Sequence, residues 1–428
     1  MNVAAIIAEY NPFHKGHQYH IKRTKEITGC SHLLVVMSGY YTQRGEPAIF
    51  SPYERAKQAL LHGADVVLEL PSLFSTASAE GFAFGAISLL HQLGVCHFLS
   101  YGCEITNLNL INDIALFLHQ EPTEYKDTLQ YYLKEGKNFP TARSLALSRF
   151  FPDLKDIDFS GSNTILALEY HRALHHFHSR IHPVIVERIH NQYNDTSLAE
   201  AGKFSSATAI RSYLEHSSTT FSTITEKQPL MQTLQQELSS SLPDSFFYSQ
   251  EEESQGLFPL FSKDFSLLLQ YKLLTQTPET LMEYLDIHQE LAQRMYRYRY
   301  EYKTPEDFCK LLKTKELTYT RISRCLLHLL LEIKKEDMKY YKTKNYCPYT
   351  RLLGFRKSST DLLHAIKENS SIPIITKNAK AASLLPQRDF TLFEQEITSC
   401  HLYEMVKSQK YQKEFQNEYT KGPIVFPL

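Results

Sequence analysis

The sequence has no excess of charge of either sign, no long apolar run and no paired cysteines. Its 46 Lys and Arg residues balance 47 Asp and Glu residues, so the formal net charge is −1. No run approaches the ~20 apolar residues of a transmembrane helix, so we expect no membrane partner. The seven cysteines form no CxxC pair, which argues against a zinc ribbon or a disulfide framework. We therefore expect a cytoplasmic protein, and its 428 residues suit two or three domains.

The first half of the chain alternates two hydrophobic patterns. Continuously apolar, β-like runs cover Val3–Ala8, Leu33–Met37, Val66–Leu70, Cys96–Tyr101 and His182–Ile189. Helical patterns cover Gly16–Thr28, Pro52–His62, Ser78–Leu93, Ser162–His176 and Ser206–Glu215. Apolar strands that alternate with such helices are typical of a parallel sheet covered on both faces. The pattern predicts an α/β domain with a Rossmann-like, doubly wound parallel sheet over residues 1–215.

The second half of the chain has a different composition. Residues 216–255 are rich in Ser, Thr and Pro, as in a linker. In residues 256–428, apolar residues recur mostly at the helical spacing i, i+3, i+4 and i+7. We therefore predict a linker followed by a mainly α-helical C-terminal region.

Charge is concentrated in part of this helical region. Residues 291–360 contain 17 Lys and Arg against 7 Asp and Glu, which leaves the rest of the chain acidic. Tyrosines are interleaved with these charges, as in MYRYRYEYK. A charged helical face is often simply solvated, but basic residues beside stacking aromatics favour an RNA-facing surface. The arginines that we select as candidate RNA ligands are Arg294, Arg297, Arg299, Arg321 and Arg324.

A turn with two histidines follows the first predicted strand. It has the sequence Glu9-Tyr10-Asn11-Pro12-Phe13-His14-Lys15-Gly16-His17-Gln18-Tyr19-His20. Open α/β folds bind ligands at this carboxyl edge, and the N–H groups of a helix N-terminus attract phosphates. Gly16 lets the backbone approach a phosphate, while His14 and His17 can donate hydrogen bonds to one that gains charge. No Glu follows the histidines as in HExxH, so we expect no protein metal site.

The segment Ser205–Arg211, SSATAIR, is a second candidate phosphate-binding motif. Its hydroxyl groups resemble a helix N-cap cluster, and Arg211 lies one turn later on the same helix. HKGH resembles the HxGH signature of the nucleotidyltransferase superfamily, and SSATAIR resembles that superfamily's ISSTxIR motif. Members attack the α-phosphate of a nucleotide and release pyrophosphate.

Over nearly its full length, the chain resembles the bacterial tRNA(Met) cytidine acetate ligases. The similarity is carried by AEYNPFHKGHQYH, MSGYYTQRGEPAIF, GADVVLELP, YGCE, SNTILALEY, ERIHNQYND and SSATAIR, with weaker matches at LTYTRISRCLL and RLLGF. The resemblance implies an enzyme that uses ATP, accompanied by Mg²⁺, to activate acetate as acetyl-adenylate. The acetyl group then passes to N4 of the wobble cytidine of elongator tRNA(Met). No protein partner is implied.

The same resemblance assigns residues to the ATP site. Ile7 and Ala8 would line it together with the turn Glu9–His20, with His14 and His17 as catalytic residues at the phosphates. Gly102 would let adenosine approach the backbone, Asn163 would bind the nucleotide, and Arg188 and Ile189 would contact the adenine side. Thr208 and Arg211 would meet the phosphate tail. Gln43, Arg44 and Glu46 are candidates for the acetyl-transfer step, although a structural turn explains them equally well.

Two alternatives remain at this stage. The chain could be a nucleotidyltransferase that adenylylates a small phosphorylated metabolite and releases pyrophosphate, as in cofactor synthesis. It could also be an RNA-binding module with a vestigial nucleotide fold. The first alternative does not explain the excess of Lys and Arg in residues 291–360, here called the basic block. The presence of both candidate phosphate-binding motifs argues against the second alternative.

Overall fold

The predicted parallel sheet is present in the computed structural model, which describes residues 1–151, 161–187, 206–218, 237–246 and 258–427. Five strands form it in the order β5-β4-β1-β2-β3, and every pairing among them is parallel. Their bounds are β1 (Val3–Ala8), β2 (His32–Ser38), β3 (Val66–Leu70), β4 (Phe98–Cys103) and β5 (His182–Glu187). The sequence prediction of a doubly wound α/β fold is confirmed.

The two faces of this sheet bury alternate residues of each strand, because successive side chains point to opposite sides. Ala4 and Ile6 of β1 pack in the same cluster as residues of α1 (Lys15–Thr28) and α2 (Pro52–Leu61). Val3 and Ala5 pack in a larger cluster with residues of α4 (Ala79–Leu93) and α8 (Ser162–His176). Helices therefore cover both faces, which explains why the strands are apolar throughout.

The C-terminal part of the chain returns to the same sheet. Strand β6 (Thr350–Arg356) pairs antiparallel with β3, and it is flanked by β7 (Ile374–Ile375) and β8 (Ile424–Phe426). These additions make the sheet eight-stranded and mixed, with β6 covering the edge of β3 that would otherwise offer unpaired backbone groups. The apolar runs of residues 1–215 gave no indication of these three later strands. Strands from both sides of the expected boundary at residue 215 therefore belong to one sheet.

A buried ion pair holds β6 at this edge. The Arg351 guanidinium contacts the carboxylate of Glu69 on β3, and its second nitrogen lies 2.9 Å from Oε1 of Glu418. All three side chains are buried. Arg351 belongs to the basic block of the sequence, but its side chain is buried and forms ion pairs inside the protein.

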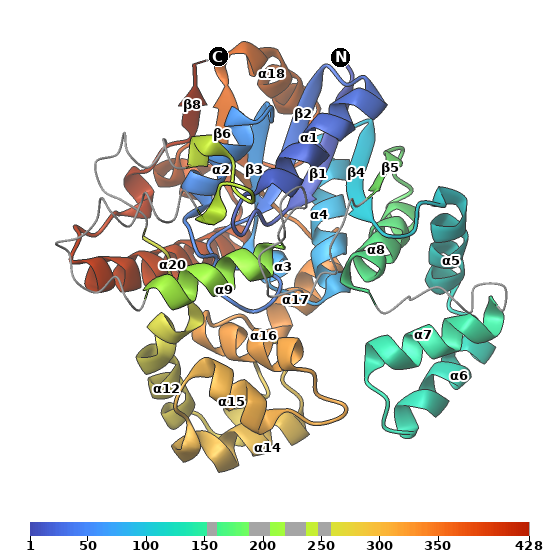
Figure 1. Ribbon diagram of the computed structural model, residues 1–428, viewed down its shortest axis with the longest axis vertical. Coiled ribbons are helices and arrows are strands. Elements are labelled where there is room, and N and C mark those ends of the chain that lie inside the picture. Colours follow the sequence, from blue (N-terminus) through green and yellow to red (C-terminus); the bar gives the residue numbers. More distant parts are fainter. Residues whose placement is uncertain (152–160, 188–205, 219–236, 247–257, 428) are drawn as a thin grey trace.

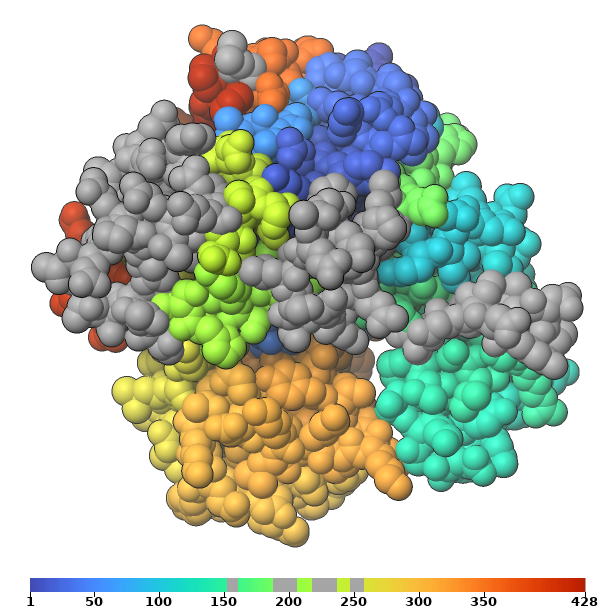
Figure 2. Space-filling view, in the orientation of Figure 1, coloured from blue at the N-terminus to red at the C-terminus, as the bar shows by residue number. Residues whose placement is uncertain are grey.

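Two helical groups lie on the same side of the sheet, at the lower edge of Figure 1. One consists of α6 (Thr123–Lys134) and α7 (Phe139–Phe150), and α5 (Leu108–Gln120), which packs against α8, leads to it. The other, here called the helical region, runs from α12 (Ser266–Thr275) through α13 (Pro278–Leu281), α14 (Gln289–Tyr298) and α15 (Pro305–Leu312) to α16 (Tyr319–Leu330). Figure 2 shows α6–α7 and the helical region as separate lobes at the lower edge.

The remaining described helices pack around the sheet. They are α3 (Ser72–Ser75), α9 (Ala207–Ser218), α17 (Lys335–Lys342), α18 (Thr360–Asn369), α19 (Ala381–Leu384) and the long α20 (Gln387–Tyr411). In the described part of the chain, no helix combines the length and the apolar character needed to cross a membrane.

Candidate active site

A pocket with a volume of about 270 Å³ opens at the carboxyl edge of the sheet. The ends of β1, β4 and β5 form its floor, and the N-terminal turns of α1, α8 and α9 surround it. Most of the predicted ATP-site residues line this pocket: Ile7, Ala8, Glu9, Tyr10, Asn11, His14, Gly16, His17, Tyr19, His20, Gly102, Asn163, Thr208 and Arg211. Residues separated by some 200 positions in the sequence thus meet at one site.

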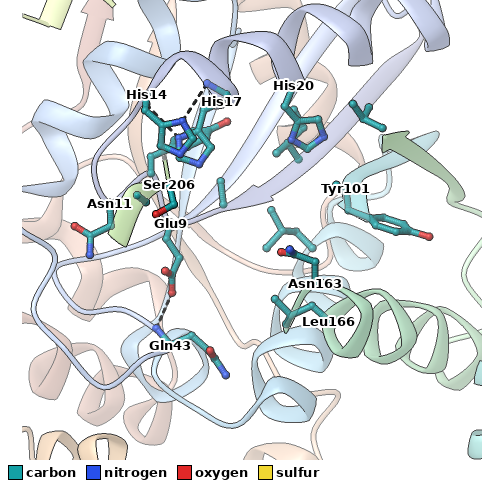
Figure 3. A pocket seen from close by; sticks show the side chains of 18 of the residues that line it. Glu9, Asn11, His14, His17, His20, Gln43, Tyr101, Asn163, Leu166 and Ser206 are labelled. Atoms are coloured by element: carbon teal, nitrogen blue, oxygen red, sulfur yellow. Dashed lines mark hydrogen bonds between the residues drawn. The ribbon is translucent and has the colours of Figure 1, made fainter. Parts of the chain in front are cut away.

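The two histidines of the HKGH motif form the N-terminal cap of α1. His14 Nδ1 accepts a hydrogen bond from the Gly16 amide at 3.0 Å, and His17 Nδ1 accepts one from the His14 amide at 3.2 Å. The two rings stack with their centroids 3.7 Å apart (Figure 3). A ring nitrogen that accepts carries no proton, so the neutral rings carry theirs on Nε2. The cap thus fixes the orientation of both imidazole rings, and with it the direction of their Nε2–H donors.

Gly16 is required for the geometry of this cap. A Cβ atom at residue 16 would lie 2.8 Å from Cε1 of His14 and 3.0 Å from Nδ1. Any side chain there would push the His14 ring out of its stack with His17. The sequence indicated Gly16 for close approach to a phosphate, and the structure adds that glycine also leaves space for the His14 ring.

Arg211 joins the two phosphate motifs. One guanidinium nitrogen donates to the carbonyl oxygen of Asn11 at 2.9 Å, and the other lies 3.2 Å from Thr208 Oγ1. The Ser206 hydroxyl caps α9 by accepting from the Ala209 amide at 3.0 Å. The start of α9 therefore presents hydroxyl groups and a guanidinium beside the β1–α1 turn, as the SSATAIR motif predicted.

The opposite wall of the pocket comes from β4 and α8. Asn163 at the start of α8 donates from Nδ2 to Glu104 Oε1 at 2.7 Å. Leu166 and Tyr170 follow it at helical spacing and also line the pocket. Sequence reasoning singled out Asn163 but missed these two, although their i+3 and i+7 spacing could have indicated the same helix face.

Tyr101 and the aromatic Phe82 complete this wall. The Tyr101 hydroxyl points away from the labelled pocket side chains (Figure 3) and lies 2.8 Å from Nε2 of His171. Burial and the nearby His175 lower the pKa of His171 to about 4. His171 is therefore neutral at pH 7 and supports the pocket wall from behind.

A loop between β2 and α2 closes the pocket on a third side. Gln43 and Arg44 of this loop line it, and the Gln43 amide donates to Glu9 Oε1 at 2.7 Å. Arg44 reaches Thr208 Oγ1 at 3.4 Å. The sequence suggested a role for these residues in the second step, and the structure places them beside the SSATAIR motif.

Some predicted residues lie elsewhere. Phe13 is buried and stacks on His62 with centroids 5.1 Å apart, while Pro12 is buried and Gln18 is exposed. The Lys15 amide and side chain donate to carbonyl groups of Ser241 and Ser239, respectively. None of these four residues lines the pocket. Arg188 and Ile189 lie outside the described residues.

Two further features bear on the chemistry. Burial raises the pKa of Tyr10 well above its usual value, so its hydroxyl stays protonated. Within the ranges that the structure describes, no group of three or more His, Cys, Asp and Glu side chains is placed to hold a metal ion. A Mg²⁺ ion at this pocket would depend mainly on phosphate oxygens and water.

The five candidate RNA ligands of the helical region differ in environment. Arg324 pairs with Asp286 at 3.6 Å with only 12% of its side chain exposed, and Arg294 reaches the Leu311 carbonyl at 3.4 Å. Arg321 is partly buried, whereas Arg297 is exposed. Arg294 and Arg324 are therefore poorly placed to meet an external partner.

Arg299 lies in an exposed aromatic stack. Its guanidinium carbon is 3.6 Å from the centroid of Tyr296 and 4.3 Å from that of Tyr300. Tyr300 is 75% exposed. The guanidinium thus holds two exposed tyrosine rings, which can stack on a planar partner.

Comparisons with known proteins agree with this geometry. The HIGH Nucleotidyl Transferase family model matches residues 1–418. The chain is 38% identical to the tRNA(Met) cytidine acetate ligase of Caldicellulosiruptor saccharolyticus, over 100% of this chain and 99% of that protein. It is 37% identical to the enzyme of the same name from Clostridium tetani, over 89% and 91% of the two chains.

Solved structures show the same fold. The crystal structure of apo TmcAL from Thermotoga maritima superposes with a TM-score of 0.90 at 29% sequence identity, covering 100% of both chains. The structure of that protein bound with alpha-thio ATP superposes with a TM-score of 0.86 over the same coverage.

Proposed function

The chain belongs to the family of tRNA(Met) cytidine acetate ligases, and we propose that the pocket at the carboxyl edge of its sheet is where this ATP-dependent ligase activates acetate. The acetyl group then passes to N4 of the wobble cytidine of elongator tRNA(Met), giving N4-acetylcytidine. The observation that carries the assignment to this pocket is the contact of Arg211 with Asn11, which ties the SSATAIR motif to the turn that carries HKGH.

In the first step, a carboxylate oxygen of acetate attacks the α-phosphorus of ATP. The bond from this phosphorus to the bridging oxygen breaks, and pyrophosphate leaves. Acetate is already ionised at neutral pH, so no general base is needed. His14 and His17 donate from Nε2 to the α-phosphate, where charge develops, and Thr208 and Arg211 bind the leaving pyrophosphate. Their positions at the pocket suit these roles.

The adenosine lies toward β4, β5 and α8 in this proposal. Gly102 at the end of β4 lets the nucleoside approach the backbone, and Asn163 binds it from the start of α8. Arg188 and Ile189, beyond β5, contact the adenine side. Mg²⁺ would accompany the phosphates and supply positive charge that offsets theirs.

In the second step, the N4 amine of cytidine attacks the carbonyl carbon of acetyl-adenylate. The bond from that carbon to the phosphate oxygen breaks, AMP leaves, and N4 loses a proton. The lone pair of N4 is delocalised into the ring, so holding the amine against the carbonyl contributes more than activating it.

The helical region binds the tRNA in this proposal. The exposed stack of Tyr296, Arg299 and Tyr300 suits an unpaired base, and Arg297 and Arg321 suit phosphates. We retain residues 1–215 as the core of the catalytic domain and 256–428 as the part that contains the tRNA-binding surface, joined by the linker 216–255. We also propose a cytoplasmic location, where tRNA and ATP occur together.

The test measures the two steps separately. Acetate should make the enzyme exchange labelled pyrophosphate into ATP, and elongator tRNA(Met) should then accept the acetyl group at cytidine N4. The absence of acetate-dependent exchange, or equal acetylation of every tRNA, would contradict the proposal. An RNA-independent adenylylated product from a phosphorylated metabolite would instead support a plain nucleotidyltransferase.

A further inference from the structure

We propose that Arg44 is an additional catalytic residue of the adenylation step, a ligand of the ATP polyphosphate whose loop is held in place by helix α16. The inference rests on the proposed function and extends it, because the loop of Arg44 connects the pocket to the helical region. Neither phosphate motif contains this residue.

Arg44 shares a hydroxyl group with Arg211. Its NH1 lies 3.4 Å from Thr208 Oγ1, and NH2 of Arg211 lies 3.2 Å from the same oxygen. Both guanidinium groups line the pocket. Guanidinium groups present several N–H donors in a fixed fork that matches the oxygens of a phosphate, and two that converge at one pocket can bind neighbouring phosphates. The convergence therefore fits the β- and γ-phosphates, which carry most of the negative charge of ATP.

The loop that carries Arg44 is a tight turn. The Thr42 amide donates to the Glu46 carbonyl at 2.9 Å, and the Gly45 amide donates to the Thr42 carbonyl at 3.0 Å. Gly45 has φ of +80°, a conformation that glycine adopts without steric cost. On the pocket side, the bond from the Gln43 amide to Glu9 ties this turn to the end of β1.

Helix α16 holds the turn from behind. The Ser323 hydroxyl donates to the Gly45 carbonyl at 2.9 Å. A Cβ atom at residue 45 would lie 2.3 Å from the Arg324 backbone nitrogen and 2.5 Å from the Ser323 carbonyl carbon. These are backbone atoms within a helix and cannot move aside locally. Any side chain at residue 45 must therefore displace the loop, and Arg44 with it.

This arrangement gives the helical region a role in the first step without contact with ATP. When the α-phosphorus bond to the bridging oxygen breaks, negative charge moves onto pyrophosphate. Arg44 and Arg211 stabilise that charge from two different elements, the loop before α2 and helix α9. Gly45 and Ser323 are positioning residues for Arg44.

The first experiment compares the binding of ATP with that of AMP by isothermal titration calorimetry. Arg44→Ala should weaken ATP binding by about 10- to 100-fold, the value of a charged hydrogen bond to phosphate. AMP lacks the β- and γ-phosphates, so its affinity should change less than about twofold. Arg44→Lys should restore part of the ATP affinity because it keeps the charge. Arg180→Ala, an exposed residue before β5, is the matched control.

The second experiment tests α16. Gly45→Ala should reproduce the selective loss of ATP affinity and of acetate-dependent pyrophosphate exchange, although Arg44 is present. Ser323→Ala should cause a smaller loss. Circular dichroism would check that each variant folds.

Three results would overturn the proposal: equal losses for AMP and ATP, unchanged exchange in Arg44→Ala, or a loss confined to acetyl transfer onto tRNA. If the wild-type protein binds ATP but shows no acetate-dependent exchange, the proposed function fails. The comparison of ATP with AMP still decides the role of Arg44 in that case.

Discussion

The turn after β1 and the helices α14–α16 are both rich in groups that donate to anions, but they hold these groups differently. In the turn, His14 and His17 cap a helix, and each ring is oriented by a backbone amide only two or three residues away. In the helices, Arg324 and Arg294 are oriented by residues more distant in the sequence, Asp286 and Leu311 respectively. Local geometry fixes the two histidines, whereas tertiary packing fixes these two arginines.

Three arginines of the basic block differ widely in how deeply they are buried. Arg299 is stacked between exposed tyrosines, Arg324 is mostly covered and paired with Asp286, and Arg351 is fully buried in the sheet. All three contribute equally to a count of charge in residues 291–360. A local excess of positive charge therefore does not establish a surface until the burial of each residue is known.

The largest effect that we predict concerns Arg351. Arg351→Met should lower the free energy of unfolding by about 3–5 kcal/mol, because Glu69 and Glu418 would then be buried without their partner. Urea denaturation would measure the change. Arg297→Met, at an exposed position of the same basic block, should change the stability by less than about 0.5 kcal/mol. Similar losses in the two variants would contradict the distinction between buried and exposed arginines.

A change in the turn should act on catalysis and leave stability nearly intact. In the proposed mechanism His17→Ala removes one Nε2–H donor to the α-phosphate, so it should reduce acetate-dependent pyrophosphate exchange by about 10²- to 10³-fold. The free energy of unfolding should fall by only about 1 kcal/mol, the value of one cap hydrogen bond, since His17 is only partly buried. An unchanged exchange rate would remove His17 from the proposed mechanism.

The sequence predicted the turn and the parallel strands better than it predicted the outer parts of the molecule. Apolar runs such as Val3–Ala8 and Val66–Leu70 coincide with strands because a strand that is buried on both faces is apolar at nearly every position. The pairing of β6 with β3 joins residues about 280 positions apart, and no local pattern encodes such a partner. Leu166 and Tyr170 were missed for a similar reason, since an apolar residue on a helix face does not reveal whether it meets a core or a ligand.

A histidine behind the pocket should make stability depend on pH. The pKa of His171 is about 4 in the folded protein and ~6.5 in an unfolded chain. Between these values the unfolded state binds more protons, so stability is fully present above pH 6.5 and falls as the pH falls. The loss between pH 6.5 and 5 should be about 2 kcal/mol. His171→Gln cannot titrate and should show a shallower decline in urea denaturation; an equal decline would assign the pH dependence to other groups.

The smallest effect that we predict concerns the exposed tyrosine Tyr300, next to Arg299. Tyr300→Ala should weaken the binding of elongator tRNA(Met) by about tenfold, the value expected for loss of one stacked base. Pyrophosphate exchange without tRNA should not change, because Tyr300, just after α14, is not among the residues that line the pocket. Tyr271→Ala is a matched control, since Tyr271 on α12 is 65% exposed and Tyr300 is 75% exposed.

Filter binding at several salt concentrations would separate stacking from charge. Arg297→Ala should weaken the binding of every RNA similarly and reduce the salt dependence by about one phosphate contact. Tyr300→Ala should leave the salt dependence unchanged, because tyrosine carries no charge. If Tyr271→Ala weakens binding as much as Tyr300→Ala does, the stack of Tyr296, Arg299 and Tyr300 is no more important than any other exposed ring, and the RNA surface must extend over α12 as well.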